Sequence, residues 1–502
     1  MDIFPKIKKF KKSNNYRFKF INKDIVSIIK NFYKSNSHRF NFLHVDIISI
    51  IKNYYLSIRH LFSFKTYIYR YRFKIYQNSV KILRSLFKDH YSKFYFLFKY
   101  IEPFLGESIR SYKIMSKDEL NFEKFLLAQG SKSISSLPKS SKKKTYLNLF
   151  GPIYGNYIKN VKLKINSSCL IQGNNFYVDS LVYKKPLDYG FGYKGFVKFY
   201  PFFDYLFCSK SLTFRRLILS KSNFKDDKII RIENGIFIGG DGSDNWYHWI
   251  IEYLPKVFLS EKLPDKFNNF PLIVPEICRK NLNFYDALAI FNRSKRKLIF
   301  FSGNEIISAK NIIYVDNVCS APFQLLNNSK PSWKDYKQHD DVLLEYFSVF
   351  KQFLYPKGLN QANNGGLKKI FLARKDSLRD YNQDEILNIS AKYGFKEVYL
   401  ERLSLEEQIK LFGSAEFVLG PSGAAWTGMI FAKENKLRCL TWMPDHFNEA
   451  CTFSNLASLL GHELNYILIQ NNKSKKSFNF HYDPYKVDPI LFEDKLKDLI
   501  CY

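Results

Sequence analysis

Residues 369–420 read KIFLARKDSLRDYNQDEILNISAKYGFKEVYLERLSLEEQIKLFGSAEFVLG. Three short apolar runs, KIFLAR (369–374), KEVYL (396–400) and EFVLG (416–420), alternate here with charged segments of helical spacing. RCLTWM (438–443) and NYILI (465–469) continue the alternation. Strands that alternate with helices are typical of a parallel, doubly wound α/β sheet. In such a sheet, ligands bind at the carboxyl ends of the strands.

A second α/β unit is predicted upstream of this one. Its strands are expected at 157–165, 176–183, 216–220, 236–240, 271–275 and 312–316, and its helices at 248–261, 283–292 and 333–355. A Gly/Asn-rich stretch at 360–366 would join the two units and leave a cleft between them. We predict a basic helical repeat region over 1–110 and a linker-like segment over 111–150, which is marked by SKSISSLPKSSKKK (131–144). Two α/β domains are predicted over 151–360 and 361–475. A C-terminal tail or helix is predicted over 476–502.

The positive charge of the chain is concentrated near its N-terminus. The 502 residues include 78 Lys and Arg against 46 Asp and Glu, and residues 1–110 hold 23 of the basic residues but only 6 of the acidic ones. This region also contains a repeat, DIVSIIKNFYKS (24–35) and DIISIIKNYYLS (46–57), with the apolar spacing of amphipathic helices. A basic, aromatic-rich surface suits an anionic bilayer or a polyphosphate backbone. A solvated helical surface in a Lys-rich chain is the simpler alternative.

Other features of the sequence bear on the compartment. No stretch of 18 or more residues is free of charge, so we predict no transmembrane helix. The N-terminal MDIFPKIKK lacks the apolar core and cleavage site of a secretory signal. The seven cysteines are scattered, without a Cys-x-x-Cys spacing. We expect a cytoplasmic chain in a reducing compartment, with neither a disulfide framework nor a metal site.

The stretch GGDGSDNWYHWIIEYLPKVF (239–258) holds the first candidate site. His248 and Glu252 are four residues apart, which places them on one face of the predicted helix. A neutral imidazole beside a carboxylate can accept a proton from a hydroxyl near pH 7. We take His248 as the candidate base, with Glu252 orienting it or serving instead, and with Asp241 and Asp244 as second choices. A histidine that only hydrogen-bonds the turn backbone is the alternative.

The stretch AEFVLGPSGAAWTGMIF (415–431) holds the second candidate site. After the strand, the small residues of the turn open a helix whose amides could meet a diphosphate; they are Gly420, Ser422, Gly423 and Ala424. Arg374 leaves a neighbouring strand at the same edge, where its guanidinium could bind a phosphate. The turn is neither a Walker A loop nor a G-x-G-x-x-G, which argues against ATP hydrolysis and nicotinamide chemistry.

Several motifs, taken in order, resemble glycosyltransferase family 61, whose bacterial members are often described as capsular polysaccharide biosynthesis proteins. The first motif is Asn245-x-Tyr247-His248-Trp249-x-x-Glu252-x-Leu254-Pro255. The second comprises Arg374, Arg379-Asp-Tyr-Asn382 and Leu403-Ser404-x-x-Glu407-Gln408. The third is Gly420-Pro421-x-Gly423-Ala424. The resemblance covers residues 170–470, and the N-terminal repeat lies outside it.

The resemblance implies the GT-B architecture, in which two Rossmann-like domains face a cleft. It implies inverting, metal-independent transfer of a sugar from a nucleotide-sugar donor, expected to be UDP-linked, to a glycan or lipid-linked acceptor in surface polysaccharide synthesis. No further cofactor is implied. Residues 150–335 would hold the acceptor and the base. Residues 360–475 would hold the donor, through Arg374, Arg379, Asn382, Glu407, Gln408 and the 420–424 loop.

Alternatives stay open at several of these positions. Arg379 could instead pair with a neighbouring carboxylate, and Glu407 and Gln408 could lie on an ordinary helix surface. The family usually has His where Ser422 stands and Asn where Gly428 stands, so an inactive relative acting as a scaffold is one alternative function. A basic nucleic-acid-binding protein is another, but no basic region resembles a known nucleic-acid motif and we expect no nucleic acid partner. The leading prediction is an enzyme on the inner face of the plasma membrane, held there by residues 1–110.

Overall fold

A computed structural model describes most of the chain after residue 108. The described residues are 109–116, 122–137, 144–173, 175–178, 216–220, 228–303, 305–320, 333–354, 366–374, 380–432, 436–444, 450–469 and 484–501. The repeat at 24–57 and the rest of the basic region up to residue 108 lie outside them, as do the junction up to residue 365 and Arg379. Within the described ranges, no helix has both the length and the apolar character needed to cross a bilayer.

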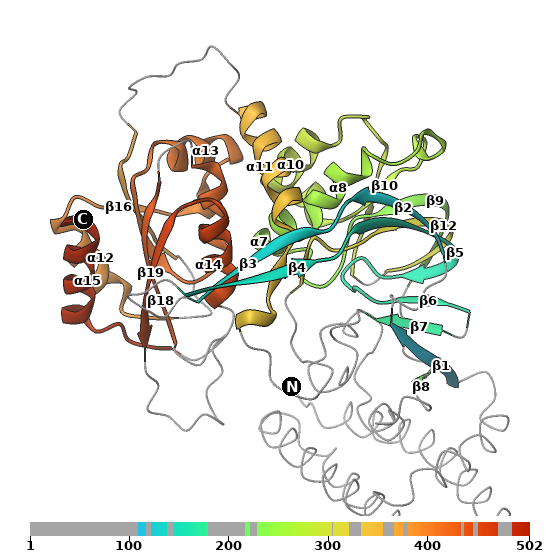
Figure 1. The fold of residues 1–502 in the computed structure, drawn as a ribbon, viewed down its shortest axis with the longest axis horizontal. Helices are drawn as coiled ribbons and strands as arrows, with labels where there is room; N and C mark the ends of the chain where they lie inside the picture. Colours follow the sequence, from blue (N-terminus) through green and yellow to red (C-terminus); the bar gives the residue numbers. More distant parts are fainter. Residues whose placement is uncertain are drawn as a thin grey trace, which may run out of the picture. The chain divides into compact units, whose positions relative to one another are not determined.

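The C-terminal sheet has five parallel strands in the order β16-β15-β17-β18-β19. Figure 1 labels β16, β18 and β19 of this sheet. The strands are β15 (Lys369–Leu372), β16 (Lys396–Val398), β17 (Phe417–Pro421), β18 (Arg438–Pro444) and β19 (Glu463–Ile469). The helices are α12 (Gln383–Lys392), α13 (Leu405–Ser414), α14 (Ala450–Leu459) and α15 (Pro489–Cys501). The prediction of a parallel α/β sheet is therefore confirmed. The strand order reverses at β15 and β17, and this switch point is where open α/β sheets bind ligands.

Alternating side chains of these strands enter two different cores. Phe371, Leu419 and Trp442 pack on one face with residues of α12 and α15. Ile370 and Val418 point to the other face, where they pack with residues of α13 and α14. Because both faces are covered, the strands read as nearly continuous apolar runs, which made them visible in the sequence.

The N-terminal sheet combines parallel and antiparallel strands, in the order β11-β10-β9-β12-β5-β6-β7-β1-β8 with β2 paired to β5. Its parallel part consists of β9 (Lys228–Phe237), β10 (Leu272–Pro275), β11 (Leu298–Phe301) and β12 (Glu305–Val315). The remaining strands are β1 (Ile109–Ser116), β2 (Glu123–Ala128), β5 (Ile153–Leu163), β6 (Leu170–Gln172), β7 (Asn175–Val178) and β8 (Arg216–Ser220). The predicted second α/β unit is thus confirmed for the parallel part. Its strand order reverses at β9 and β12, a second switch point.

The helices between these strands differ in detail from the prediction. The helix expected at 248–261 is divided into α7 (Trp246–His248), a π-helix η6 (Trp249–Tyr253) and α8 (Leu254–Ser260). The helix expected at 283–292 is present as α10 (Leu282–Phe291), after the short α9 (Ile277–Lys280). The helix expected at 333–355 begins only at Asp340, as α11 (Asp340–Leu354). Residues 333–338 form η8 (Trp333–Asp335) and β14 (Lys337–Gln338), which pairs with β13 (Cys319–Ser320).

The prediction of a linker-like segment over 111–150 is wrong. This segment contributes β1 and β2 to the N-terminal sheet, and β3 (Ser131–Leu137) pairs with β4 (Lys144–Phe150) as an antiparallel hairpin. Four of the serines in this stretch, Ser131, Ser133, Ser135 and Ser136, are buried. The Ser133 hydroxyl accepts from the amide of Gln338 at 2.9 Å, and the Ser135 hydroxyl donates to the carbonyl of Tyr336 at 2.6 Å. Serine fits here because it is small and brings its own hydrogen-bonding group into a buried strand.

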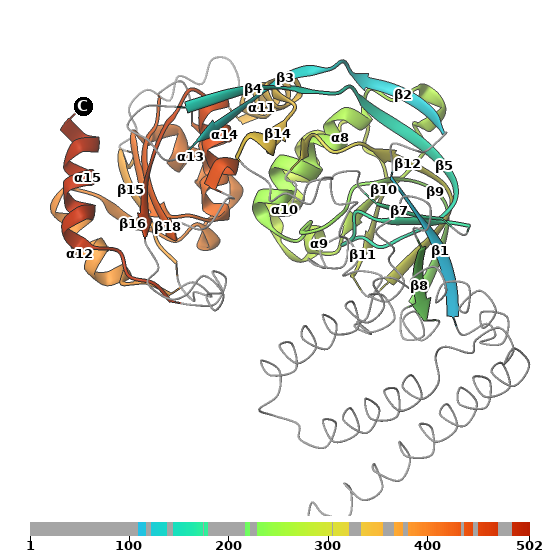
Figure 2. The same ribbon diagram turned by 60° about the horizontal axis from the view of Figure 1, so that its bottom comes forward.

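Strand β3 also lies beside α14 of the C-terminal sheet (Figure 2). The amide of Ser136 donates to Oδ1 of Asn455 at 2.6 Å. The amide of Ile134 donates to Oδ2 of Asp340 at 2.9 Å. Asp340 is buried, and this burial raises the pKa of its carboxyl to about 6. Ionisation of this carboxyl is therefore less favourable in the folded protein than in the unfolded chain, although the bond from Ile134 partly offsets the effect of burial.

Replacing Asp340 by Asn tests how much ionisation of this carboxyl destabilises the folded protein. Asn keeps an acceptor for the Ile134 amide but cannot ionise. Because the carboxyl pKa is higher in the folded protein, its contribution to stability is complete near pH 4 and is lost as the pH rises through about 6. Asp340→Asn should therefore gain stability relative to the parent as the pH rises, by at most about 3 kcal/mol between pH 4 and 7. Urea unfolding at several pH values measures the difference, with Asp341→Asn, an exposed neighbour, as control. Parallel curves for parent and variant would contradict the prediction.

Candidate functional site

Glycines after β9 bring the backbone close to the candidate base. Gly242 has φ +76°, and a Cβ atom there would lie 2.9 Å from Cδ2 of His248. Gly240 has φ +150°, and a Cβ atom there would lie 2.5 Å from the hydroxyl oxygen of Tyr253. Only glycine adopts these conformations without strain and leaves this space. The turn ends at Asn245, whose side chain accepts from the amide of Tyr247 at 3.0 Å and starts the helix.

The structure brings His248 and Glu252 together at the carboxyl end of β9. Nδ1 of His248 lies 2.9 Å from Oε2 of Glu252, and the side chains are 39% and 18% exposed. The two atoms are at ion-pair distance, although the N–H direction lies outside hydrogen-bond geometry. The pair is thus reachable from solvent and partly shielded from it.

The two second-choice carboxylates have different surroundings. Asp244 lies exposed in the turn, and it is Glu252 that the structure places against the imidazole. The backbone of Asp241 is fixed, because its carbonyl accepts from the Tyr253 hydroxyl at 2.7 Å and its amide donates to the Ser168 hydroxyl at 3.2 Å. Burial raises the pKa of Tyr253, so this hydroxyl remains a donor at neutral pH. Sequence reasoning missed Tyr253 and Ser168, since nothing in their spacing links them to the turn.

The second candidate site lies at the switch point of the C-terminal sheet. Arg374 follows β15, and its Nη2 donates to the carbonyl of Ser422 in the turn after β17. A Cβ atom at Gly423 would lie 2.5 Å from this nitrogen, and one at Gly420 would lie 2.8 Å from Cβ of Leu372. The two glycines therefore let the turn approach β15 and the guanidinium closely. Burial lowers the pKa of Arg374.

Arg374 is held by a glutamine that the sequence analysis did not single out. Oε1 of Gln383 accepts from the Arg374 amide at 2.8 Å, and Nε2 donates to the Arg374 carbonyl at 3.0 Å. The Tyr381 hydroxyl donates to the same Oε1 at 3.1 Å. Tyr381 in turn stacks on Tyr485, with ring centroids 5.7 Å apart. These contacts of Gln383 and Tyr381 fix the backbone of Arg374, from which the guanidinium extends.

Three predicted donor-binding residues have roles inside the fold. Asn382 bridges to Val487, accepting from its amide at 2.8 Å and donating to its carbonyl at 3.0 Å. Glu407 closes a capping box at the start of α13 by accepting from the Ser404 amide at 2.7 Å. Gln408 is buried and donates to the carbonyls of Leu400 and Leu403, both at 3.1 Å. These contacts give all three side chains partners within the fold, and the capping box of Glu407 is a contact expected of a helix-surface residue.

The remaining residues of the predicted donor site lie in or beside the turn. Ser422 is buried, and its amide donates to the carbonyl of Trp442 at 3.0 Å. Ala424 begins η10 (Ala424–Phe431), a 3-10 helix instead of the α-helix expected there. Arg379 lies outside the described residues.

The elements that carry the two sites touch each other. Helix α7, which contains His248, packs against η10. The ring centroids of Tyr247 in α7 and Phe453 in α14 are 5.3 Å apart. Side chains of both sheets and their helices belong to one hydrophobic core, in which Phe350 of α11 packs on Phe431 of η10 at 5.4 Å. A proton acceptor and a partly buried cation thus lie on neighbouring elements at the carboxyl ends of parallel strands.

Metal ligands do not gather in this region. Among the described residues, no group of three or more His, Cys, Asp or Glu side chains is placed to hold a metal ion. The cysteines that the structure describes are not joined in disulfides.

Comparison with known proteins agrees with the motifs at both sites. Residues 246–439 match the family model described as Glycosyltransferase 61, so the match begins at α7 and ends in β18. None of the curated proteins compared with the chain matches it. The matched part therefore contains His248, Glu252, Arg374 and the 420–424 turn. The region that carries both sites is a domain of glycosyltransferase family 61.

Proposed function

We propose that this protein is an inverting glycosyltransferase that moves a sugar from a nucleotide-sugar, UDP-linked in our proposal, to a hydroxyl of a glycan or lipid-linked acceptor. The observation that carries the proposal is the pair formed by His248 and Glu252, 2.9 Å apart, within the family 61 domain. The motifs also suggest bacterial surface polysaccharide synthesis, of capsule or lipopolysaccharide, as the pathway. The GT-B arrangement across a cleft remains part of this proposal.

The proposed reaction is a single displacement at the anomeric carbon. The acceptor oxygen forms a bond to this carbon while the bond to the donor diphosphate breaks, and the bonding electrons leave with the diphosphate. With Nδ1 facing Glu252, the Nε2 atom of His248 keeps a lone pair that takes the proton of the acceptor hydroxyl. The carboxylate stabilises the imidazolium that forms. Attack from the face opposite the leaving group inverts the configuration.

The departing diphosphate needs positive charge. We propose that Arg374 supplies it, without a metal ion or a further cofactor, at the β15 and β17 switch point. Its Nη2 already binds the Ser422 carbonyl, and its other N–H groups can donate to phosphate oxygens. Amides at the start of η10 would add further donors.

The place of the reaction in the cell is proposed from the sequence. The basic residues of 1–110 suit the anionic inner leaflet of the plasma membrane, where each Lys or Arg near the surface is worth about 1 kcal/mol. An enzyme held there would meet cytoplasmic nucleotide-sugars and lipid-linked acceptors.

One observation favours the inactive scaffold as a second candidate function. The family usually has Asn where Gly428 stands, but the ring of Phe412 fills the space that a side chain would need there. Together with Ser422, this change alters the region next to the proposed donor site. A chain that binds no nucleotide would fit the scaffold better than the enzyme.

Substitution of His248 tests the proposed base. His248→Ala should lower the turnover of the accepted nucleotide-sugar by about 10²–10⁴-fold, the contribution that is typical of a general base. Glu252→Gln should cause a smaller loss, because the base remains. Nucleotide release from UDP-sugars measures turnover even with water as acceptor. Glu276→Gln breaks a comparable contact, with Lys280 four residues away at 2.9 Å, and serves as control. Full activity of a folded His248→Ala variant would contradict the assignment.

Substitution of Arg374 tests the donor site. At about 100 times its dissociation constant a bound nucleotide stabilises a protein by about 2.7 kcal/mol, which should raise the melting temperature of the parent by a few degrees. Arg374→Ala should lose the response to UDP, and Arg374→Lys should keep part of it, because lysine retains the charge without the planar fork.

Arg402→Ala is the matched control for this experiment. Arg402 lies in η9 (Leu400–Arg402), after the edge strand β16, and its guanidinium is 4.3 Å from the ring centroid of Tyr399. A full UDP response in Arg374→Ala would contradict the proposed role of Arg374. No response of the parent to UDP, GDP, CMP or dTDP would favour the scaffold.

A further inference from the structure

The distance between His248 and Glu252 depends on an unusual helical turn. Residues 249–253 form a π-helix, in which the amide of Leu254 bonds to the carbonyl of Trp249, five residues back. Such turns are rare and frequently occur at functional sites. Glu252 lies inside this turn and His248 at its start. The geometry of the pair is therefore set by whatever holds the π-helix in place.

Pro255 accounts for the interruption of the α-helix. In a regular α-helix the carbonyls of Ile250 and Ile251 would accept from the amides of residues 254 and 255. Pro255 has no amide hydrogen, and its ring disfavours the regular position of the Ile251 carbonyl. Leu254 donates to Trp249 instead. The carbonyls of Ile250 and Ile251 are thereby released from these two α-helical bonds, and both residues are fully buried.

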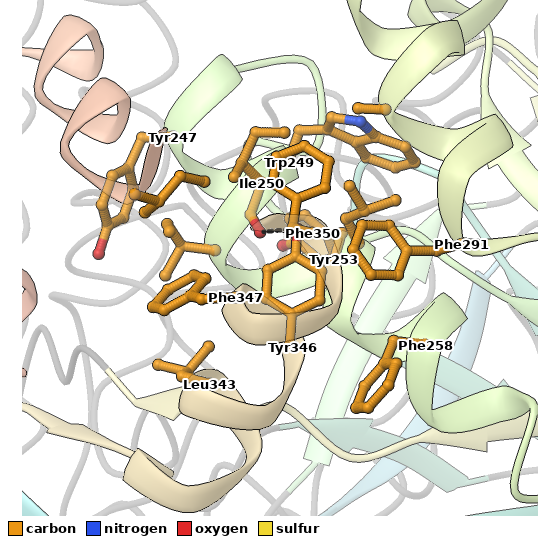
Figure 3. Packing of buried hydrophobic residues seen from close by; sticks show 14 of the residues in the cluster. Tyr247, Trp249, Ile250, Tyr253, Phe258, Phe291, Leu343, Tyr346, Phe347 and Phe350 are labelled. Atoms are coloured by element: carbon orange, nitrogen blue, oxygen red, sulfur yellow. Dashed lines mark hydrogen bonds between the residues drawn. The ribbon is translucent and has the colours of Figure 1, made fainter. Parts of the chain in front are cut away.

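Both released carbonyls are bound by side chains from distant parts of the chain. The Tyr346 hydroxyl of α11 donates to the carbonyl of Ile250 at 2.9 Å (Figure 3). The thiol of Cys319 donates to the carbonyl of Ile251 at 3.8 Å. Burial raises the pKa of both groups, so both keep their protons at neutral pH. Because a buried carbonyl without a partner is destabilising, these two donors stabilise the π-helix against a regular turn.

The Tyr346 ring has little freedom to move. It is fully buried and packs against the rings of Phe258, Phe291, Phe347 and Phe350 at centroid distances of 6.1, 4.6, 5.4 and 6.1 Å (Figure 3). The packing thus fixes the position of its hydroxyl, which binds the carbonyl of Ile250, two residues before Glu252.

We propose that Tyr346 is a positioning residue for the His248–Glu252 pair, acting through the carbonyl of Ile250. The proposal rests on the proposed function, because it assumes that the pair is the base. The hydroxyl keeps the π-helix formed, the π-helix holds the Glu252 carboxylate beside Nδ1, and the carboxylate keeps the proton on Nδ1. Nε2 is then left as the proton acceptor.

Nitrogen NMR of His248 in the full chain tests the proposal without any substrate. The two ring nitrogens have well separated ¹⁵N shifts when one tautomer dominates, and His248→Gln assigns the signals. The parent, studied at about pH 8 where an ordinary imidazole is neutral, should show the proton on Nδ1. Tyr346→Phe keeps the ring packing but removes the donor, and we expect the separation of the two shifts to be lost. Glu252→Gln should give the same loss.

Tyr466→Phe is the matched control. It removes a tyrosine hydroxyl that bonds to Ser454 at 3.0 Å in the C-terminal sheet, and it should leave the His248 spectrum unchanged. Where Tyr346→Phe does not fold, Pro255→Ala is read instead. This change supplies the missing amide and favours a regular helix, so it should also shift the His248 signals. Unchanged His248 signals in a folded Tyr346→Phe variant, or in Pro255→Ala if that is the variant read, would overturn the proposal.

The experiment separates this proposal from the proposed function. A shifted His248 spectrum in Tyr346→Phe, with no transferase activity in the parent, would support the positioning role and overturn the function. An unchanged spectrum, together with transfer that depends on His248, would support the proposed function and overturn the positioning role of Tyr346.

Discussion

One hydrophobic core joins the helices of the two sheets, and the arrangement of both candidate sites depends on it. Phe350 of α11 packs on Phe431 of η10, and Tyr247 of α7 packs on Phe453 of α14. Burial of aromatic rings is the largest favourable contribution that such contacts offer. Helix α7 follows the glycine-containing turn after β9, and η10 follows the one after β17. Because α7 packs against η10, the two turns lead into neighbouring elements. The proposed base and the proposed cation, which follow strands of different sheets, therefore lie on elements that touch each other.

The parallel strands could be predicted from the sequence, and the hairpin could not. Strands covered on both faces are apolar throughout, as in Phe417–Pro421, and they are recognisable without knowledge of their neighbours. Strand β3 is instead stabilised by long-range bonds between its serines and residues 336–341, about 200 positions away, so its composition resembles that of a linker. The late start of α11 has the same cause, because residues 337–339 use their backbone to bind β13 and β3.

The candidate site was predictable to a similar extent. The four-residue spacing of His248 and Glu252 identified the pair, and the small residues after β17 identified the turn that Arg374 contacts. The motif did not indicate that Asn382, Glu407 and Gln408 bind groups within the fold, since a residue type in a motif does not tell ligand contacts from backbone contacts. Gln383, Tyr253 and Tyr346 act through backbone atoms of other residues, and such contacts leave no pattern in a single sequence.

The central claim is that one base drives a single displacement on a nucleotide-sugar. Proton NMR of the product formed from an accepted nucleotide-sugar, recorded before the anomers equilibrate, tests it most directly. We expect the new anomeric centre to have the configuration opposite to that of the donor, and His248→Ala to form this product about 10²–10⁴-fold more slowly. Retention of the donor configuration would contradict it, because retention requires two displacements or a different mechanism.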